Sequence, residues 1–361
     1  MRKLAGFIRK IGRMRAMRML LVVVFLLASA MSPMPVWVVQ TSGIDTNLRG
    51  VSVVHFRDPV GAEAPVVWAS GSNGAILGPP RTGKEWTRLH VAGGETLDFR
   101  SIRAFDEKTA YVMSSGEGEK SRIYKTTDGG QTWALQFTGS RPAFFLDALV
   151  CDSPKHCLAL SDPVDGRFLI ISTYDGEKWL PLDQLAMPLA LKDEGAFAAS
   201  GTCLALYGND IYFVTGGPAA RLFHSPDLGR RWSAIPLPIA SGNPAAGAFS
   251  VARHGKNMVV VGGDYKNPGR RERVAAYSHD AGRTWKLAAQ SPAGYRSAVA
   301  WLDDRTIATA GPSGEEISTD GGVHWKPNST LNLNALAVLN LHEAWAVGAN
   351  GTISRFSLET Q

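Results

Sequence analysis

Arginines and tyrosines at a few points of the chain could hold or transform a polar ligand. Arg49, Arg100 and Arg296 could together grip a carboxylate, with Tyr295 beside the last of them. A phenol nucleophile with a glutamate partner and an acid/base aspartate would make such a site a glycoside hydrolase. No glutamate lies next to Tyr265 or Tyr295 in the sequence, so we predict a binding site and no catalytic residue.

Other enzyme chemistries lack their sequence motifs. The chain has no Gly-x-Ser-x-Gly turn and no Gly-x-Gly-x-x-Gly loop between a strand and a helix, and its eight histidines are scattered over expected turns and strand ends. No second Cys/His pair stands at metal-ligand spacing. We therefore predict neither a metal site nor a cofactor.

Residues 1–30 differ in composition from the rest of the chain. They hold seven of the 38 basic residues and none of the 32 acidic ones; a basic stretch ends at Arg18, and an apolar run over 19–27 precedes Ala-Ser-Ala at 28–30. This order predicts a cleaved signal peptide, with an uncleaved anchor reaching Val39 as the alternative. The remaining 31 basic and 32 acidic residues give no basic surface for nucleic acid.

Three cysteines suit an exported protein with one disulfide bond. Cys151 and Cys157 flank five residues between two apolar runs, so they could face each other across a hairpin. A bond between Cys157 and Cys203 is one alternative, and three free buried thiols are the other.

One eight-residue phrase occurs four times with the pattern Ser/Thr-x-Asp-x-Gly-x-x-Trp. Its copies are TTDGGQTW at 126–133, SPDLGRRW at 225–232, SHDAGRTW at 278–285 and STDGGVHW at 318–325. Degenerate copies occur at 173–179 and 81–86. The six closing tryptophans are 40 to 53 residues apart, about the length of one four-stranded propeller blade.

The phrase fits a tight hairpin turn. Its aspartate can accept backbone N–H groups, its glycine supplies a left-handed backbone, and its tryptophan can pack on the next strand. We therefore expect structural roles for Asp128, Trp133, Asp227, Trp232, Asp280, Trp285, Asp320 and Trp325.

Each repeat unit contains three expected strands before the phrase and a fourth that begins with its tryptophan. After Trp325 the chain offers three more strands but no fourth. The segment WVVQTSG at 37–43 matches WALQFTG at 133–139, so we expect the N-terminal strand to complete the last blade. The prediction is an all-β, seven-bladed β-propeller over residues 31–361, one domain that follows a signal peptide at 1–30. Six or eight blades would result if a degenerate copy is misread.

Four further blocks carry a resemblance to a known family: SDPVDGRF at 161–168, TGGPAAR at 215–221, GGDY at 262–265 and GYRS at 294–297. The repeated phrase is identified as the Asp-box, or bacterial neuraminidase repeat. The chain most resembles the photosystem II stability and assembly factors and their relatives in non-photosynthetic bacteria. That resemblance implies a non-catalytic scaffold that binds a protein partner during assembly of a larger complex.

Propellers bind ligands or partners mostly at the loops of one face and at the mouth of the central channel. Residues just before the innermost strand of a unit, which include Asp147 and Glu194, belong near that mouth. The predicted partner- or ligand-binding residues are Arg49, Arg100, Asp162, Asp165, Arg167, Arg221, Asp264, Tyr265, Tyr295 and Arg296. The alternative is an internal salt-bridge network, or for 165–167 a hairpin turn with solvated charges.

The sequence thus predicts an exported, periplasmic or otherwise extracytoplasmic protein that binds a protein partner as an assembly or stability factor. Nucleic acid is not an expected partner. Membrane contact is expected only through an uncleaved leader or a membrane-protein client. A sialidase-like glycoside hydrolase acting on acidic glycans is the alternative function.

Overall fold

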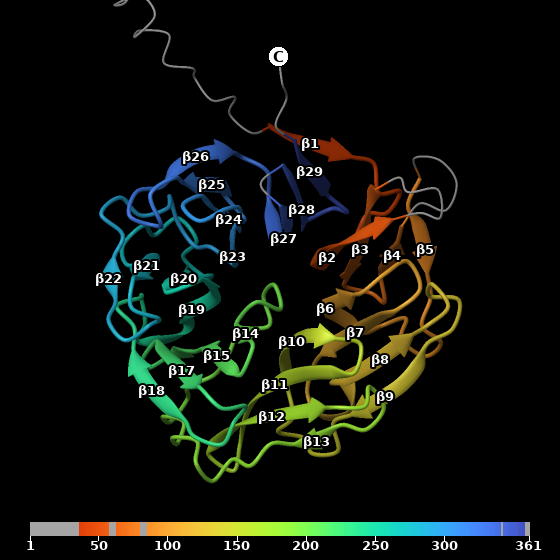
Figure 1. Ribbon diagram of the computed structural model, residues 1–361, viewed down its shortest axis with the longest axis horizontal. Helices are drawn as coiled ribbons and strands as arrows, with labels where there is room; N and C mark the ends of the chain where they lie inside the picture. Colours follow the sequence, from red (N-terminus) through yellow and green to blue (C-terminus); the bar gives the residue numbers. More distant parts are fainter. Residues whose placement is uncertain (1–35, 58–62, 80–84, 341, 358–361) are drawn as a thin grey trace, which may run out of the picture. The chain divides into compact units, whose positions relative to one another are not determined.

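Seven antiparallel sheets follow one another around a ring (Figure 1), which confirms the predicted seven-bladed β-propeller. The computed structural model describes residues 36–57, 63–79, 85–340 and 342–357, and Trp37–Ser357 form one compact unit. The predicted signal peptide at 1–30 lies outside the described residues. In the part of the chain that is described, no helix is long and apolar enough to cross a membrane.

Each blade is a meander of four strands, numbered outward from the ring centre in blades 1 to 6. Blade 1 consists of β2 (Leu48–Arg57), β3 (Glu63–Gly71), β4 (Ile76–Gly78) and β5 (Thr87–Leu89). Blade 2 consists of β6 (Asp98–Ala104), β7 (Ala110–Ser115), β8 (Arg122–Thr126) and β9 (Ala134–Thr138). Blade 3 consists of β10 (Leu146–Ser153), β11 (His156–Val164), β12 (Arg167–Thr173) and β13 (Leu180–Pro181). A short 3-10 helix, η1 (Gly118–Lys120), precedes β8.

The remaining blades follow the same order. Blade 4 consists of β14 (Leu204–Tyr207), β15 (Asp210–Val214), β17 (Arg221–Ser225) and β18 (Ser233–Pro236), and blade 5 of β19 (Asn243–His254), β20 (Asn257–Asp264), β21 (Ala275–Ser278) and β22 (Lys286–Leu287). Blade 6 consists of β23 (Ala298–Trp301), β24 (Ile307–Gly311), β25 (Gly314–Ser318) and β26 (Lys326–Ser329). Blade 7 consists of β27 (Leu333–Asn340), β28 (Glu343–Gly348), β29 (Ile353–Ser357) and β1 (Val36–Gln40). The short β16 (Gly216–Gly217) pairs with β19.

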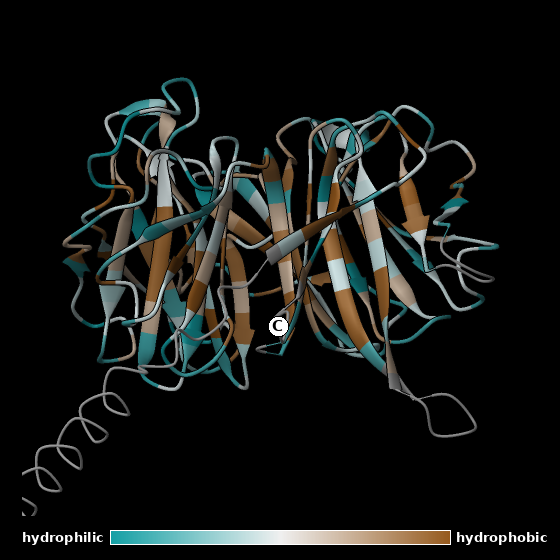
Figure 2. Cartoon of the chain, turned by 90° about the horizontal axis from the view of Figure 1, so that it is seen from above, coloured by the Kyte–Doolittle hydropathy of each residue, from teal (hydrophilic) through white to brown (hydrophobic). Residues whose placement is uncertain are grey.

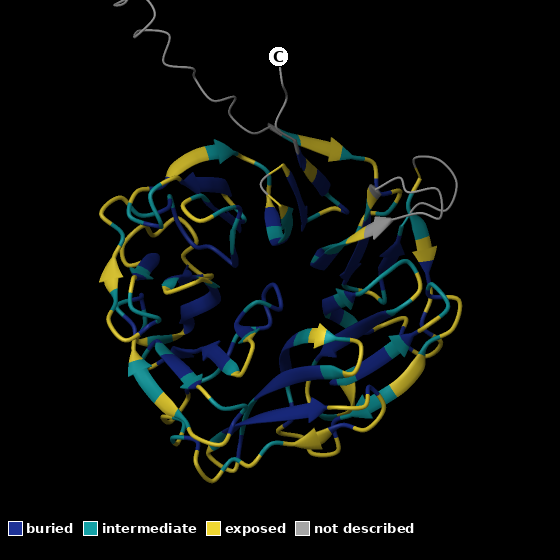
Figure 3. Cartoon of the chain, viewed as in Figure 1, coloured by how far each residue is buried: buried dark blue, intermediate teal, exposed yellow. Residues whose placement is uncertain are grey.

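Burial follows the position of a strand within its blade. The second strands β7 and β28 are buried along their whole length, because each blade packs both of its faces against neighbouring blades. The outermost strands are largely exposed (Figure 3). In side view the apolar residues concentrate along the strands, and hydrophilic residues concentrate in the loops on the two faces of the ring (Figure 2).

The N-terminal strand closes the ring, as the sequence predicted. Blade 7 has the order β27, β28, β29, β1, so its outermost strand comes from the other end of the described chain (Figure 1). Trp37 on β1 packs edge-on against Phe356 on β29, with ring centroids 5.4 Å apart. Closure leaves no unpaired strand at the seam.

Truncating the seam tryptophan should therefore loosen the whole domain. We expect Trp37→Ala to lower the free energy of unfolding by roughly 2 to 3 kcal/mol, since it removes a large packed ring at the closing strand. Val39→Ala on the same strand is the control, because Val39 is 54% exposed. Urea unfolding of both variants checks this, and equal stabilities would contradict the role given to the seam.

The four intact copies of the repeated phrase form the same hydrogen-bonded turn. At the last copy, Ser318 Oγ and the His324 N–H donate to Asp320 Oδ1 at 2.9 and 3.0 Å, and the Gly322 N–H donates to Ser318 Oγ. Burial alone would raise the pKa of Asp320, but these hydrogen bonds lower it below its usual value. The same contacts recur at Asp128, Asp227 and Asp280.

Tryptophans that end intact or degenerate copies of the phrase also contact an aromatic ring of a neighbouring blade. Trp133 stands edge-on to Trp68 of the preceding blade, with ring centroids 6.3 Å apart, and Trp179 stands likewise on Tyr111 at 6.1 Å. Trp86, at the end of the copy at 81–86, contacts Trp345 of blade 7 at 5.9 Å; residues 81–84 of that copy lie outside the described residues. The turn thus positions a ring that joins two blades.

Removing one turn aspartate should destabilise the domain. We expect Asp320→Ala to lower the free energy of unfolding by roughly 1 to 3 kcal/mol, the scale of lost hydrogen bonds to a charged group. Asp304→Ala is the control, because Asp304 is exposed in the same blade. Thermal unfolding compares the two, and a stable Asp320→Ala protein that has lost partner binding would contradict a structural role.

Cys151 and Cys157 lie opposite each other in the β10–β11 hairpin and are joined by a disulfide. Cys203, which immediately precedes β14, is a buried free thiol. The structure therefore has the hairpin pairing rather than the Cys157–Cys203 alternative.

Candidate functional site

One face of the ring gathers the candidate residues. We call it the front face: the first strand of every blade begins there, and because the strands alternate in direction, the loops between second and third strands lie there too. The turns formed by the repeated phrase join third and fourth strands and therefore lie on the opposite face.

A loop lies inside the ring. This central loop, residues 195–203, precedes β14 and is the green loop inside the ring in Figure 1. Arg100 Nη1 donates to the Ala198 carbonyl at 2.8 Å, Ser200 Oγ donates to the Ser297 carbonyl at 2.7 Å, and Thr202 Oγ1 contacts Ser250 Oγ at 2.7 Å. The loop is thus tied to blades 2, 5 and 6.

The sequence analysis predicted a channel mouth but missed this loop. Its run GAFAASGTC has no repeat and no charge, so only its small residues and the long connection between β13 and β14 hinted at it. Arg100, one of the predicted residues, consequently contacts this loop rather than an open channel mouth.

An aromatic cluster lies beside the central loop. Phe197 stacks on Phe249 at 3.8 Å, and Tyr295 stands edge-on to Phe249 at 4.7 Å between ring centroids. Tyr265 stands edge-on to both phenylalanines and is 47% exposed, whereas Tyr295 is 8% exposed. Tyr265 therefore offers the accessible ring of the cluster.

Arg49 and Arg100 lie next to this cluster and close to each other. Burial first, and the charge of Arg100 second, lower the pKa of Arg49. Burial raises the pKa of Tyr295, and the two arginines partly oppose that rise. Arg100 Nε donates to Asp98 at 2.7 Å, so one acid compensates two neighbouring cations. The pair can bind an anionic or carbonyl-rich group.

Two other predicted residues are held in internal ion pairs. Arg221 donates through Nε and Nη2 to both oxygens of Glu194, whose side chain is fully buried. Arg296 is 1% exposed, and its Nη2 lies 3.3 Å from Glu316. These pairs match the salt-bridge alternative, because both guanidinium groups are occupied inside the protein.

Three more predicted residues make local contacts within turns or at the surface. Asp165 is at the tip of the β11–β12 hairpin with a φ of 57° and pairs with exposed Arg141. Arg167 Nε donates to the Gln184 carbonyl at 3.1 Å. Asp264 is 2% exposed and accepts from the Lys266 N–H at 2.9 Å and from Asn267. These local contacts account for the positions of Asp165, Arg167 and Asp264 without a ligand.

An acidic pair lies on the other side of the central loop. Asp147 on β10 is 1% exposed, and neither of its carboxylate oxygens accepts a hydrogen bond of normal geometry from another described residue. Burial, then the nearby Asp162 carboxylate, raise its pKa well above the usual value, with Arg100 opposing. Burial also raises the pKa of Asp162 to about 6, although the Ala196 N–H donates to Asp162 Oδ1 at 2.9 Å.

The geometry does not favour the glycoside hydrolase alternative. That chemistry needs Arg49, Arg100 and Arg296 to converge on one carboxylate, but Arg296 already pairs with Glu316 and donates to Ser313 at 2.9 Å. Among the described residues, no group of three or more His, Cys, Asp or Glu side chains is placed to hold a metal ion.

Comparison with known proteins relates the chain to other propellers. No protein-family model and no curated protein sequence matches it. It is similar to the structure of YCF48 bound to a D1 peptide (14% identity, TM-score 0.63, 89% of this chain and 96% of that chain covered). YCF48 from Cyanidioschyzon merolae gives 15% identity, a TM-score of 0.63, and coverage of 89% and 98%.

A third similar structure is BamB from Moraxella catarrhalis, with 13% identity, a TM-score of 0.50, and coverage of 86% of this chain and 85% of that chain. At these identities the likenesses show a shared propeller fold.

The unpaired acid Asp147 yields a prediction about stability. A carboxyl group whose pKa is raised by folding binds its proton more tightly in the folded state, so wild-type stability falls as the pH rises above the usual carboxyl range. We expect Asp147→Asn to raise the free energy of unfolding at pH 7.5 by roughly 1 to 3 kcal/mol, and by less at pH 4.

Glu119→Gln removes one exposed acid and is the control for the change in charge. Urea unfolding at the two pH values checks the prediction. A variant that is less stable than the wild type at pH 7.5 would show that Asp147 has a stabilising partner after all.

Proposed function

We propose that this chain is a non-catalytic protein-binding factor that acts outside the cytoplasm in the assembly or stability of a larger complex. One observation carries the proposal: Arg49, Arg100 and the exposed ring of Tyr265 lie together on the front face, beside the central loop. Such a surface offers charge, hydrogen bonds and an aromatic contact area to a polypeptide.

The comparisons support the proposal through the fold that they share with this chain. The YCF48 structure contains a bound D1 peptide, so a propeller of this shape can serve as a peptide receptor. The Asp-box resemblance to photosystem II assembly factors and their bacterial relatives points in the same direction. The client of this chain is a protein that has yet to be identified.

Export is part of the proposal. The order of basic, apolar and small residues over 1–30 is that of a signal peptide, and the Cys151–Cys157 disulfide suits an oxidising compartment such as the periplasm. On this proposal, contact with a membrane comes through the leader, if it is retained, or through a membrane-protein client.

Capture from the native cell envelope tests the proposal. We expect the wild-type protein to retain a specific protein partner and Arg49→Gln/Arg100→Gln to lose most of it, because the variant removes both front-face cations. Arg230→Gln/Arg283→Gln is the control, since it removes two exposed arginines in turns of the opposite face. Arg296 is avoided, because its loss would leave Glu316 buried and unpaired.

Circular dichroism and thermal unfolding establish that the captured variants are folded. A partner that binds both double variants equally well would place the interface elsewhere. Turnover of acidic glycans by the wild type would contradict the non-catalytic function.

A further inference from the structure

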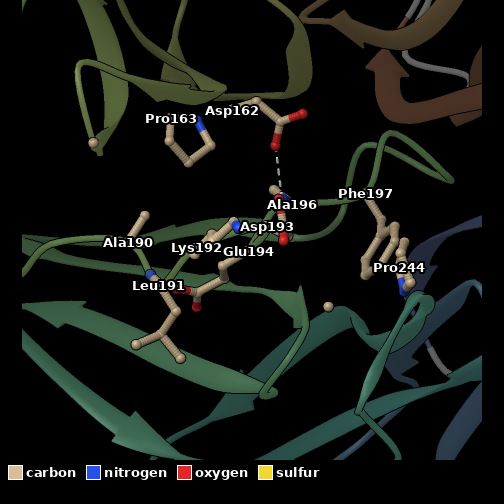
Figure 4. A pocket seen from close by; sticks show the side chains of 13 residues that line it. Asp162, Pro163, Ala190, Leu191, Lys192, Asp193, Glu194, Ala196, Phe197 and Pro244 are labelled. Atoms are coloured by element: carbon tan, nitrogen blue, oxygen red, sulfur yellow. Dashed lines mark hydrogen bonds between the residues drawn. The ribbon is translucent and has the colours of Figure 1, made fainter.

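A cavity of about 540 Å³ opens on the front face beside the central loop (Figure 4). Asp162 and Pro163, near the end of β11, lie on one side of it, and residues 190–197 lie on the other. Phe197 and Pro244 stand together at one end in Figure 4. The cavity therefore combines apolar walls with an acid.

The charges around this cavity do not balance. Glu194 lines it, but Arg221 neutralises that carboxylate from behind. This leaves Asp162 and Asp193 against Lys192, and no ion pair joins these three among the described residues. The Asp162 carboxylate is also close enough to the buried Asp147 to raise the pKa of Asp147 further. When Asp162 is ionised, the lining residues thus carry more negative than positive charge.

One carboxylate oxygen of Asp162 has no donor among the described residues. Its Oδ1 accepts the Ala196 N–H at 2.9 Å, whereas no described residue donates to Oδ2. A guanidinium group binds a carboxylate best through two parallel hydrogen bonds, and an ammonium group needs only one acceptor. The geometry therefore suits an ammonium group better than a guanidinium group.

Exposed leucines lie along the chain that leads into the cavity. Leu185, Leu189 and Leu191 are 83%, 58% and 43% exposed, and Leu191 itself lines the cavity. Exposed apolar side chains next to a polar pocket mark surfaces that contact a partner. An alkyl stem entering the cavity would lie against Leu191 and Pro163.

We propose that this cavity binds a lysine side chain of the partner protein, with the ammonium on Asp162 Oδ2 and the alkyl stem along Leu191 and Pro163. Apolar residues that flank the lysine contact the exposed leucines. The assignment rests on the proposed protein-binding function and adds the chemistry that selects the partner. Its binding residues differ from those of the Arg49 and Arg100 surface.

Short peptides test this assignment without the native partner. The probes are Ac-Leu-Lys-Leu-NH2, the uncharged analogue with norleucine in place of lysine, and the arginine analogue, each titrated by ligand-observed NMR against the protein comprising residues 31–361. We expect the lysine peptide to bind at least fivefold more tightly than the norleucine peptide, and the arginine peptide to bind with intermediate affinity.

Asp162→Asn should abolish the preference for lysine, because the amide keeps an acceptor for the Ala196 N–H and loses the charge. Asp165→Asn is the matched control, since Asp165 lies on the same hairpin and pairs outward with Arg141. Unfolding curves show whether Asp162→Asn is as stable as the wild type. Equal binding of lysine and norleucine peptides, or a preference for lysine that survives in Asp162→Asn, would overturn the assignment.

A pH titration adds a second readout. Asp162 has a pKa of about 6, so the wild type should bind the lysine peptide more weakly at pH 5 than at pH 7.5. The other titratable or charged groups around it are Asp147 on β10, Arg100 on β6, Cys203 before β14, and Lys192, Asp193 and the Glu194–Arg221 pair across the cavity. Asp162→Asn should show little pH dependence in this range; the same pH dependence in both proteins would assign it to another group.

The peptide result and the capture experiment can fail separately. If the peptides show no preference for lysine while capture still depends on Arg49 and Arg100, the cavity assignment is wrong and the protein-binding function stands. If the lysine preference is found but no envelope protein is captured, the cavity is a cation site and the proposed function is wrong.

Discussion

The pairing of β1 with β29 is the interaction on which the rest of the structure depends. Every blade packs both faces against its neighbours, so a blade that lacked its outer strand would expose an unpaired strand edge at the seam. The tryptophans of the repeated turns also join neighbouring blades, because the rings of Trp133 and Trp179 contact the preceding blade. Closure and blade contacts together make the ring one cooperative unit.

Several charged side chains are buried within the ring, where an unpaired charge would be unfavourable. Glu194 with Arg221, and Glu316 with Arg296, are buried as matched pairs. Asp147 and Asp162 are different, since burial raises the pKa of both carboxyl groups and no described residue gives Asp147 a hydrogen bond of normal geometry. Groups that reduce stability in this way are typical of functional sites, where binding rather than stability determines the residue. This contrast separates structural charges from candidate binding charges on the same face.

Much of the fold could be predicted from the sequence, because the same local turn motif recurs along the chain. The Ser/Thr-x-Asp-x-Gly-x-x-Trp phrase marks the turn between the third and fourth strands in four blades, and degenerate copies mark it in two more. The likeness between 37–43 and 133–139 predicted the closing strand. The site was harder, because pairing depends on distances across blades. Nothing local shows that Arg296 meets Glu316. The central loop carries no repeat and no charge, so its path through the ring centre could not be predicted, nor could the cavity beside it.

Hydrogen–deuterium exchange of the protein, alone and with its captured partner, tests the central claim most directly. The account predicts slower exchange on binding in residues 185–203 and around Tyr265, all on the front face, with the turns of the opposite face unchanged. Protection confined to those opposite turns, or to the outer strands of the blades, would contradict a front-face binding site.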